Sequence, residues 1–407
     1  MLTNAGRTNS SLSFVSLFSG CGGLDLGFQQ AGFRCIGAYD ADQNALETHS
    51  KNLDSPIFLC DLTPARLPNK LKTKPVVVVA GSPCQGFSTI GKRDIDDKRN
   101  DLLLASGKIA VALKPTFFIA ENVPAVVYGS HAKFWEQLIE LLSEAGYYCS
   151  TLLLKASDFG VAQMRKRLFL IASRRSGIGT PDIPGTGLLT VGKALDNMDP
   201  NIPNHELIPL DCKSPEYLIA KRIRAGQKLC NVRISERSVH TWNIPEVFGE
   251  TSKLERAILV LVTRLRRRER ERTFGDADPV RLDVLKRELG FDPTPQLVAL
   301  KAKGYIRSFE RGRYDLTHTF NGKFRRLDAE GVSPTVDTRF GAARNFLHPF
   351  EHRALTVREA ARLQGFPDNF RFEGGRAQQY KCVGNAVPPP MARSIANKLR
   401  ALISEGA

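Results

Sequence analysis

The chain has 407 residues, of which 42% are hydrophobic and 25% are charged, and its formal net charge is +16. Such a length exceeds what one compact core holds, and the apolar content excludes a disordered chain, so two or three domains are expected. No apolar run approaches the roughly 20 residues that span a bilayer, and the N-terminus lacks a signal-peptide pattern. We therefore expect a cytoplasmic protein without a membrane partner. The basic balance indicates a polyanionic partner, most often nucleic acid.

The first 175 residues alternate short apolar runs with helix-like stretches. A helix is predicted from Lys133 to Ala145, because Phe134, Leu138 and Leu142 fall on one face at helical spacing. Repetition of strand, helix and strand predicts an α/β fold, with a parallel sheet that helices cover on both faces. The runs predicted to form buried strands are residues 13–18, 33–40, 57–61, 75–81, 116–123 and 167–173.

A stretch rich in glycine and proline, GIGTPDIPGTG, begins at Gly177 and predicts a linker. From there to about residue 325 the chain is basic and irregular. Residues 254–272 are predicted to form a helix that is apolar early and charged late. Its charged end is either part of a binding surface or a solvated helix with ion pairs four residues apart.

Two further helices and a hairpin are predicted after that helix. In each helix an N-cap residue precedes a proline and a glycine marks the end, with the signals at Asp278-Pro279 and Gly290 and at Thr294-Pro295 and Gly304. The sequence YIRSFERGRYDL then predicts two short strands around Arg311-Gly312. Three helices followed by a hairpin resemble a winged helix, which would either contact DNA or serve packing or dimerisation.

Periodic order returns after residue 350. LTVREAARLQGFP predicts an amphipathic helix, and GNAVPPPMARSIANKLRALI predicts a turn that leads into a helix. No pair of cysteines has C-x-x-C spacing, so neither a zinc finger nor a disulfide framework is expected, and no metal is predicted. The eight cysteines are at positions 21, 35, 60, 84, 149, 212, 230 and 382.

Glycines and acids follow the first three predicted strands. Gly20, Gly22 and Gly23 join the first strand to a helix, in a turn that is neither a P-loop nor a full G-x-G-x-x-G fingerprint. Asp40 and Asp61 end the next two strands, where a carboxylate would meet ribose hydroxyls. Together they favour a nucleoside cofactor without a tightly held phosphate, and S-adenosylmethionine fits better than NAD. Taken alone, the glycines are equally consistent with a plain tight turn.

Cys84 lies past the fourth strand, at the same sheet edge, within GSPCQGFS. Pro83 stiffens the approach, and the polar stretch that follows predicts a surface loop rather than more core. Glu121 closes the fifth strand at that edge. A carboxylate beside a thiolate suits a reaction in which one group attacks and the other handles a proton. The alternatives are an inert buried thiol and a solvated or helix-capping acid.

Gln163, Arg165 and Arg167 alternate ahead of the last apolar run of this region. A period of two places all three side chains on one face of a strand. That face is either an exposed edge or a contact for an anion or a carbonyl group.

Six motifs in family order resemble the DNA (cytosine-5)-methyltransferases of the bacterial restriction-modification type. The resemblance covers about residues 1–175 and 330–396. It implies a Rossmann-like sheet that binds S-adenosylmethionine and releases S-adenosylhomocysteine, a smaller target-recognition domain, and double-stranded DNA as the partner. The motifs are FSGCGG at 18–23, GSPCQGFS at 81–88, ENV at 121–123, QMRKR at 163–167, LTVREAARLQGFPD at 355–368 and GNAVP at 384–388.

The resemblance also implies how the chain is divided. We expect a catalytic, cofactor-binding domain over residues 1–178 and a target-recognition region over 179–329, with the winged-helix-like insert at 253–317. Residues 330–407 return to the catalytic domain. Further expectations are a monomer on nucleoid DNA in a bacterial cytoplasm, and a cognate restriction or phage-defence system.

The family's functional positions carry over onto matching residues. Position 40 is Asp where the family more often has Glu, and the shorter acid can still reach a ribose. The implied catalytic residues are Cys84, Glu121, Arg165 and Arg167, and the implied DNA contacts are Gln85, Ser88, Arg99 and Gln163. The implied cofactor contacts are Phe18, Gly20, Gly22, Gly23, Leu24, Asp40, Ala41, Asp61, Leu62, Pro83, Asn385, Ala386 and Val387.

The implied mechanism is covalent. The Cys84 thiolate adds to C6 of a flipped-out cytosine, and C5 then takes the methyl group. Glu121 hydrogen-bonds N3 and the amino group, and Arg165 holds the base carbonyl and helps keep the thiolate charged. Arg167 supports Arg165 or contacts a phosphate. The loop from Gln85 to Asn100 would fill the gap that the flipped base leaves.

Three other functions compete with DNA methylation. The same chemistry on RNA, as in the family's tRNA-modifying branch, is disfavoured by the long basic middle region. A DNA-binding regulator with a decayed enzyme domain is disfavoured because Cys84, Glu121 and Arg165 are intact. A cofactor-binding domain that acts on small molecules would need neither the +16 charge nor the large middle region.

Overall fold

The computed structural model describes residues 12–83, 100–175, 187–273 and 277–405. The chain divides into two compact units. The first contains Met1–Glu206, Val332–Thr338 and Val357–Ala407, so it extends past residue 178 and is completed by two later segments. The second contains Leu207–Gly331 and Arg339–Thr356. In the part of the chain that is described, no helix has the length and apolar character needed to cross a membrane.

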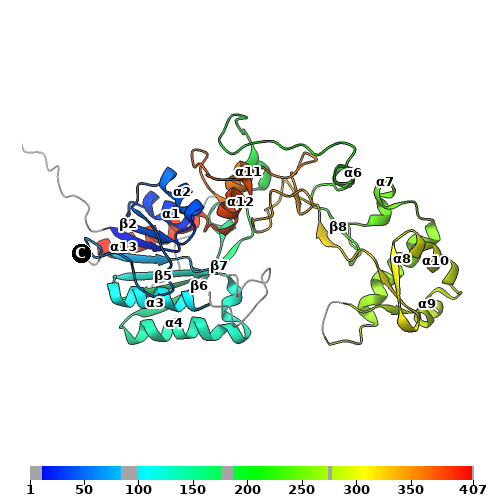
Figure 1. Ribbon diagram of the computed structural model, residues 1–407, viewed down its shortest axis with the longest axis horizontal. Helices are drawn as coiled ribbons and strands as arrows, with labels where there is room; N and C mark the ends of the chain where they lie inside the picture. The colour runs from blue at the N-terminus through cyan, green and yellow to red at the C-terminus, as the bar shows by residue number, and fades with distance from the viewer. Residues whose placement is uncertain (1–11, 84–99, 176–186, 274–276, 406–407) are drawn as a thin grey trace, which may run out of the picture. The chain divides into compact units, whose positions relative to one another are not determined.

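A seven-stranded sheet forms the middle of the first unit, in the order β3-β2-β1-β4-β5-β7-β6 (Figure 1). All six predicted strands are present, and the α/β prediction is confirmed. The prediction of a wholly parallel sheet is wrong, because β7 runs antiparallel to both β5 and β6. The strands are β1 (Ser13–Leu17), β2 (Arg34–Asp40), β3 (Ile57–Leu59), β4 (Val77–Ala80), β5 (Phe117–Asn122), β6 (Tyr148–Lys155) and β7 (Lys166–Ser173).

Strand β6 was not predicted from the sequence. It lies at the edge of the sheet, and most of its residues are half-buried or exposed, so it lacks the continuous apolar run of a central strand. The connection from β6 to β7 is short, and a connection of that length can join only antiparallel strands. The short connection therefore makes β7 run antiparallel to β6.

Alternating side chains of the central strands fill two cores, one on each face of the sheet. Phe14, Val77 and Phe117 belong to the core beneath α1 (Gly23–Gln30) and α13 (Pro389–Glu405), whereas their chain neighbours belong to the other core. That second core packs against α3 (Asp101–Leu113) and α4 (Ala132–Glu144), which lie together on one face in Figure 1. Each fully buried side chain of this size contributes about 2 kcal/mol, so the sheet is a rigid base for its loops.

The C-terminal segment returns to pack on the first helix. A side chain at Gly27 would meet the Cβ atom of Ala392 and the carbonyl of Pro389 at 2.5 Å, so only glycine permits this contact between α1 and α13. Helix α12 (Arg376–Asn385) precedes α13, and α2 (Gln43–Asn52) and α11 (Val357–Gln364) lie in the same unit. The first and last motifs therefore belong to one compact body.

The second unit has a small core of its own around Ile223, Leu229 and Leu347. Arg326 is buried beside that core and donates to the carbonyls of Ala220, Ile223, His348 and Glu351, which joins segments far apart in sequence. The elements of this part are α6 (Pro215–Arg222), β8 (Lys228–Cys230), β9 (Ser238–Val239), α7 (Pro245–Phe248), β13 (Asn321–Lys323), β14 (Arg325–Arg326) and β15 (Phe346–Leu347).

Residues 253–317, called the insert below, form a further cluster of helices and strands with a separate apolar core. Three helices precede a hairpin, as the sequence predicted, and the three-stranded sheet has the order β10-β12-β11. This is the arrangement of a winged helix. The elements are α8 (Lys253–Arg268), β10 (Val280–Arg281), α9 (Leu282–Leu289), α10 (Thr294–Ala302), β11 (Ile306–Phe309) and β12 (Arg313–Leu316).

Two helix starts in the insert differ from their predictions. Asp278 does not cap a helix, because its carboxylate accepts the backbone N–H groups of Glu271 and Arg272, and α9 begins only at Leu282 after strand β10. Thr294 is the first residue of α10 rather than its N-cap. The predicted ends are confirmed, since Gly290 and Gly304 have φ angles of 76° and 77° just past α9 and α10.

Candidate active site

A tight turn connects β1 to α1 at the carboxyl edge of the sheet. Phe18, Gly20 and Gly22 have positive φ angles of 55°, 55° and 90°, which is the conformation that the glycines make accessible. The backbone N–H of Gly20 donates to the Asp40 carboxylate at 2.8 Å, so the end of β2 holds the turn in place.

Below the turn, Asp25 is fully buried and is satisfied by two partners. It accepts a hydrogen bond from the Ser16 hydroxyl at 2.6 Å and lies 2.8 Å from Nε2 of His49. Gly22 packs against this His49 ring and against Leu53, which leaves no space for a side chain. Gly22 therefore supports the turn from behind.

The turn also lies against the last motif of the chain. A Cβ atom at Gly23 would meet the carbonyl oxygen of Val387 at 2.6 Å and the Cβ atom of Ala386 at 2.9 Å. Nearby, the Cys21 thiol donates to the carbonyl of Cys382 at 3.4 Å. The first and last motifs thus form two walls of one site.

We predict that Gly23→Ala weakens S-adenosylmethionine binding by roughly tenfold to a hundredfold, because the new methyl group must push the Val387 backbone away. Isothermal titration calorimetry with the cofactor measures this change. Gly375→Ala is the matched control, since a Cβ atom there meets nothing within 4 Å. Equal affinities of both variants and the wild type would contradict the close packing of the two motifs.

Three carboxylates stand at the ends of β2 and β3. Asp40 receives backbone N–H groups from Gly20 and Asp42, but burial dominates and raises the pKa of Asp40. Burial also acts to raise the pKa of Asp42, yet hydrogen bonds from Lys381 and Gln378 outweigh it and the pKa is lowered. Asp61 is exposed and accepts from the backbone and hydroxyl of Thr63. The Asp40 carboxylate lines the cavity at the end of β2, where a carboxylate can accept hydrogen bonds from ribose hydroxyls.

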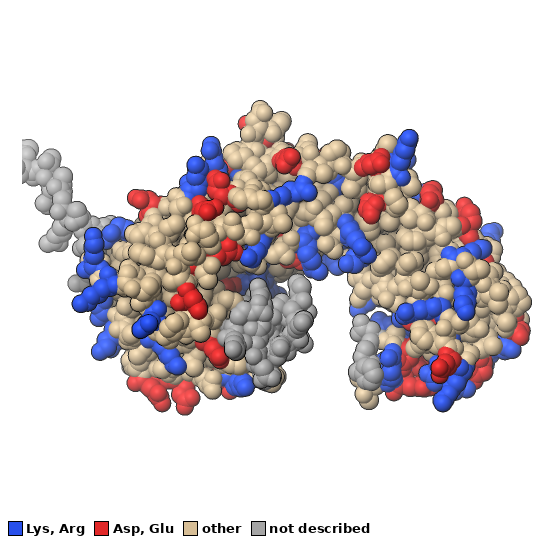
Figure 2. Space-filling view, viewed as in Figure 1, with Lys and Arg blue, Asp and Glu red and all other residues tan. Residues whose placement is uncertain are grey.

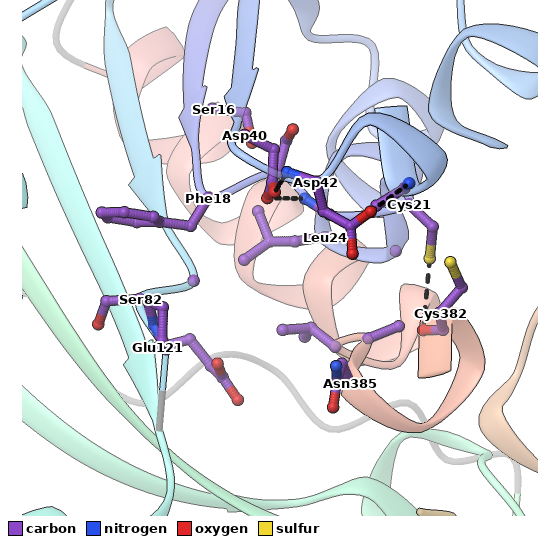
Figure 3. Close-up of a pocket in the computed structure, with 18 of the residues that line it drawn as sticks. Ser16, Phe18, Cys21, Leu24, Asp40, Asp42, Ser82, Glu121, Cys382 and Asn385 are labelled. Atoms are coloured by element: carbon purple, nitrogen blue, oxygen red, sulfur yellow. Dashed lines mark hydrogen bonds between the residues drawn. The ribbon is translucent and has the colours of Figure 1, made fainter. Parts of the chain in front are cut away.

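These features surround a cavity of about 320 Å³, within the range of sites that bind a nucleoside-sized molecule. Figure 3 shows Leu24 near the middle of the site, with Asp40 above it and Asn385 below, and Phe18 also lines the cavity. Of the predicted cofactor residues, Gly22 alone does not line it. Those that do are Phe18, Gly20, Gly23, Leu24, Asp40, Ala41, Asp61, Leu62, Pro83, Asn385, Ala386 and Val387.

Sequence reasoning missed several residues of this cavity. Asp42 caps α2 and is bonded to Gln378 and Lys381 on α12. The N-cap position of Asp42, directly after a strand that ends in Asp40, was the available signal. Nothing in the sequence alone pairs Asp42 with a residue more than 330 positions away.

Glu121 and Arg167 form an ion pair at the other end of the cavity. Nε of Arg167 lies 2.7 Å from a carboxylate oxygen of Glu121, and the two side chains are 12% and 10% exposed. Both line the cavity, and Figure 3 shows the Glu121 carboxylate pointing into it. The ion pair therefore presents a fixed carboxylate and a partly exposed guanidinium to a ligand that binds at this end of the cavity.

Arg165 differs from its predicted environment. It is 1% exposed, and it donates from Nη1 to the carbonyls of Val336 and Gly384 at 3.1 Å each. Arg165 also lines the cavity, and its Nη1 hydrogen bonds join the Arg165 segment to the segments of Val336 and Gly384. Arg167 was expected to support Arg165 or to contact a phosphate; in the structure its guanidinium is ion-paired with Glu121.

Gln163 also lies away from any surface. Its side chain is fully buried, donating to the Leu363 carbonyl and to Gln364 and accepting from the backbone of Val336 at 3.0 Å. These contacts occupy both ends of the amide, so in this structure Gln163 holds α11 and the segment near Ser333 in place. It does not face a DNA surface as predicted.

The remaining predicted residues Cys84, Gln85, Ser88 and Arg99 lie outside the described residues. Pro83, the residue before Cys84, lines the cavity, and so does Ser82. Across the described ranges no cluster of histidine, cysteine, aspartate or glutamate could hold a metal ion.

The donor set fits S-adenosylmethionine. The glycine turn leaves a cradle that a Cβ atom at Gly23 would fill, Asp40 offers acceptors for ribose hydroxyls, and Phe18, Leu24 and Leu62 provide apolar walls. The cavity has one lining lysine, Lys381, which is bonded to Asp42. Sheet, turn and cavity together define a Rossmann-like domain with a site of the size and chemistry that suit a nucleoside-containing cofactor.

Comparison with known proteins identifies the family. The profile of the C-5 cytosine-specific DNA methylases matches residues 12–229 and 232–401, so the chain belongs to this family. The sequence-based assignment as a DNA (cytosine-5)-methyltransferase is confirmed.

Relatives span nearly the whole chain. It is 32% identical over 397 residues to Type II methyltransferase M.XorII of Xanthomonas oryzae pv. oryzae, covering 95% of this chain and 84% of the relative. It is 28% identical to Type II methyltransferase M.AgeI of Thalassovita gelatinovora, covering 96% and 99%. Among solved structures, a protein described as a prophage-encoded DNA modification methyltransferase (E. coli) is 26% identical, with a TM-score of 0.59 and coverage of 97% and 100%.

Proposed function

We propose that this protein methylates C5 of a specific cytosine in double-stranded DNA, with Cys84 as the nucleophile. The observation that carries the proposal is the cavity in which the glycine turn, the last motif and the Glu121–Arg167 pair meet beside Pro83. Cys84 follows Pro83, which lines the cavity, directly in the sequence.

The Cys84 thiolate forms a bond to C6 of the cytosine, and the ring electrons shift toward N3 and C5. Glu121, sharing a proton with N3, stabilises the charge that develops there. When bound, S-adenosylmethionine supplies an electrophilic methyl group. Loss of the C5 proton and expulsion of the thiolate then restore the aromatic ring, and Cys84 is free again.

Arg167 is the residue we assign to orienting Glu121, and its guanidinium contacts the base carbonyl only while the ion pair with Glu121 holds it in place. Its guanidinium is fixed by the ion pair yet 12% exposed and lines the cavity, whereas Arg165 is buried and donates from Nη1 to two backbone carbonyls. Arg165 is therefore a positioning residue that holds the Val336 and Gly384 segments. These assignments exchange the roles expected from the sequence, in which Arg165 contacted the base carbonyl and Arg167 had a supporting role.

We predict that Arg167→Met lowers the methylation rate by roughly a hundredfold, because it removes one hydrogen-bond donor and leaves Glu121 unanchored. Cofactor affinity should stay near the wild-type value, since the Asp40 side of the cavity is unchanged. Single-turnover methyl transfer and calorimetry measure the two quantities. Lys166→Met, which removes a charge from the exposed neighbour, is the control and should keep the wild-type rate.

The biological setting is part of the same proposal. The relatives M.XorII and M.AgeI are both named Type II methyltransferases, and this supports a role beside a cognate restriction or phage-defence enzyme. We propose that the protein acts as a monomer on nucleoid DNA in a bacterial cytoplasm. Gln85, Ser88 and Arg99 are proposed DNA contacts on the strength of the sequence motifs.

Bisulfite sequencing of DNA from a host that expresses the protein tests the proposal. We expect full protection of one cytosine within a short recurrent sequence, and none in cells that carry an empty vector. A parallel assay offers labelled S-adenosylmethionine with either duplex DNA or tRNA. Methyl incorporation into tRNA alone would replace the proposal with the RNA-modifying alternative.

A further inference from the structure

The tip of the hairpin in the insert has an unusual residue at its turn. Between β11 and β12, Arg311 and Gly312 have φ angles of 58° and 64°. Two consecutive residues in this region form the turn that glycine, asparagine and aspartate favour, and an arginine there is strained. The strained position belongs to a charged residue on an exposed tip, which suggests a role outside the fold of the insert.

Half of the lysines and arginines of the insert have an ion pair within the described residues. Arg266 binds Asp315, Arg268 binds Glu288, and Arg313 lies 3.2 Å from Glu271. On the face seen in Figure 2, basic and acidic side chains are accordingly interspersed. Arg311 is exposed, and within the described ranges of the chain it has no ion pair.

Helix α10 and the hairpin form one continuous surface. Lys301 near the end of α10 donates to the Ser308 hydroxyl of β11 at 2.7 Å. The guanidinium of Arg307 lies 5.2 Å from the ring centre of Phe309 and 3.7 Å from the Asp315 carboxylate, and the Arg307 and Phe309 side chains are exposed. We call α10 together with residues 306–313 the wing surface.

The wing surface is cationic and nearly free of acids. Helix α10 has no acidic residue, and its apolar side chain Val298 is 62% exposed. The acid of β12, Asp315, is buried against Arg266, so Glu310 is the one acid that the hairpin tip exposes. An exposed apolar residue such as Val298 suits contact with thymine methyl groups. Lys301 and Arg311, which have no ion pair within the described residues, suit phosphates.

We propose that the wing surface is a second DNA-binding site of this protein, separate from the cytosine pocket. Helix α10 lies in the major groove, and Arg311 at the tip of the hairpin enters the adjacent minor groove. Narrow minor grooves of A·T-rich DNA concentrate negative potential and attract an inserted arginine. A contact between Arg311 and DNA would account for a strained arginine at a position where glycine would be unstrained. The inference takes DNA as the partner from the proposed function and adds a new contact to it.

Arg311→Gly in the full-length protein is the decisive variant, because glycine removes the charge and also relieves the turn. It should be at least as thermally stable as the wild type and yet bind a long DNA duplex roughly tenfold more weakly, with a salt slope smaller by about one. Preference for A·T-rich over G·C-rich duplexes should be lost. Fluorescence anisotropy over a range of salt concentrations measures affinity, slope and preference.

Arg264→Ala is the matched control, since it removes one exposed charge from α8 on another part of the insert. It should leave the A·T preference intact. Equal effects of the two variants, or wild-type binding by Arg311→Gly, would overturn the inference. So would a dimer in analytical ultracentrifugation that Val298→Lys dissociates while DNA binding is unchanged, because the surface would then join two copies.

Methylation by the wild type separates this inference from the proposed function. If the wild type methylates duplex DNA and Arg311→Gly binds it normally, only the second site is wrong. If the wild type neither binds nor methylates duplex DNA, the proposed function fails as well.

Discussion

Cys84→Ser is expected to abolish methyl transfer, by a factor of at least about 10⁴, while DNA binding stays measurable. A serine hydroxyl is hardly ionised at neutral pH, whereas a thiol near cationic groups forms a thiolate readily. Without addition to C6, carbon C5 of cytosine is too poor a nucleophile to take a methyl group. The loss should therefore appear in the chemical step and not in affinity.

Two measurements separate these effects. Transfer of a labelled methyl group under single-turnover conditions reports the chemical step, and anisotropy with a duplex that contains the methylated sequence reports binding. Cys212→Ser makes the same chemical change at an exposed thiol of the second unit and should behave as the wild type. Turnover by Cys84→Ser near the wild-type rate would eliminate covalent catalysis by this residue.

Much of the cofactor site could be predicted from the sequence because its residues follow strand ends. The carboxyl ends of parallel strands meet at one edge of a sheet, so Phe18, Asp40, Asp61 and Pro83 converge once the strands are recognised. Gly22 is the instructive exception. Gly22 stands in the same glycine turn as Gly20 and Gly23, which line the cavity. It does not line the cavity itself, because it packs against His49 of helix α2.

The roles of the two arginines could not be predicted, because they depend on strand direction. Since β7 runs antiparallel to β5, Glu121 pairs with Phe169, and Arg167 lies diagonally across from Glu121 on the same face. Alternation alone placed Gln163, Arg165 and Arg167 on one face without showing which of them reaches Glu121. The partners of Gln163 and Arg165 lie 171 to 219 residues away in the chain, where no local pattern reveals them.

The start of helix α9 in the insert could not be predicted from the sequence for a similar reason. Asp278-Pro279 has the residues of a helix start, but the Asp278 carboxylate is used by the backbone of Glu271 and Arg272. Val280 then pairs with Tyr314 of β12, which adds a strand before the helix begins. Tertiary pairing overrides a local capping signal wherever the same groups have better partners.

Glu121→Gln is the other change expected to have a large effect, lowering the methylation rate by about 10²- to 10³-fold. Glutamine keeps the size of the side chain but cannot share a proton with N3 as a carboxyl group does. It also breaks the ion pair and leaves the guanidinium of Arg167 facing the cavity without its anion. Single-turnover rates measure the effect, and Glu136→Gln, at an exposed position on α4, is the control.

A double-mutant cycle of Glu121→Gln and Arg167→Met tests whether the catalytic effect of Arg167 depends on Glu121. If Arg167 works by holding the Glu121 carboxylate, removing it from a protein that already lacks that carboxylate costs little more, and the double variant should be about as slow as Glu121→Gln alone. Multiplication of the two losses would instead show that Arg167 acts on the base independently of Glu121. Because the pair is 2.7 Å apart and only 10–12% exposed, we expect strong non-additivity.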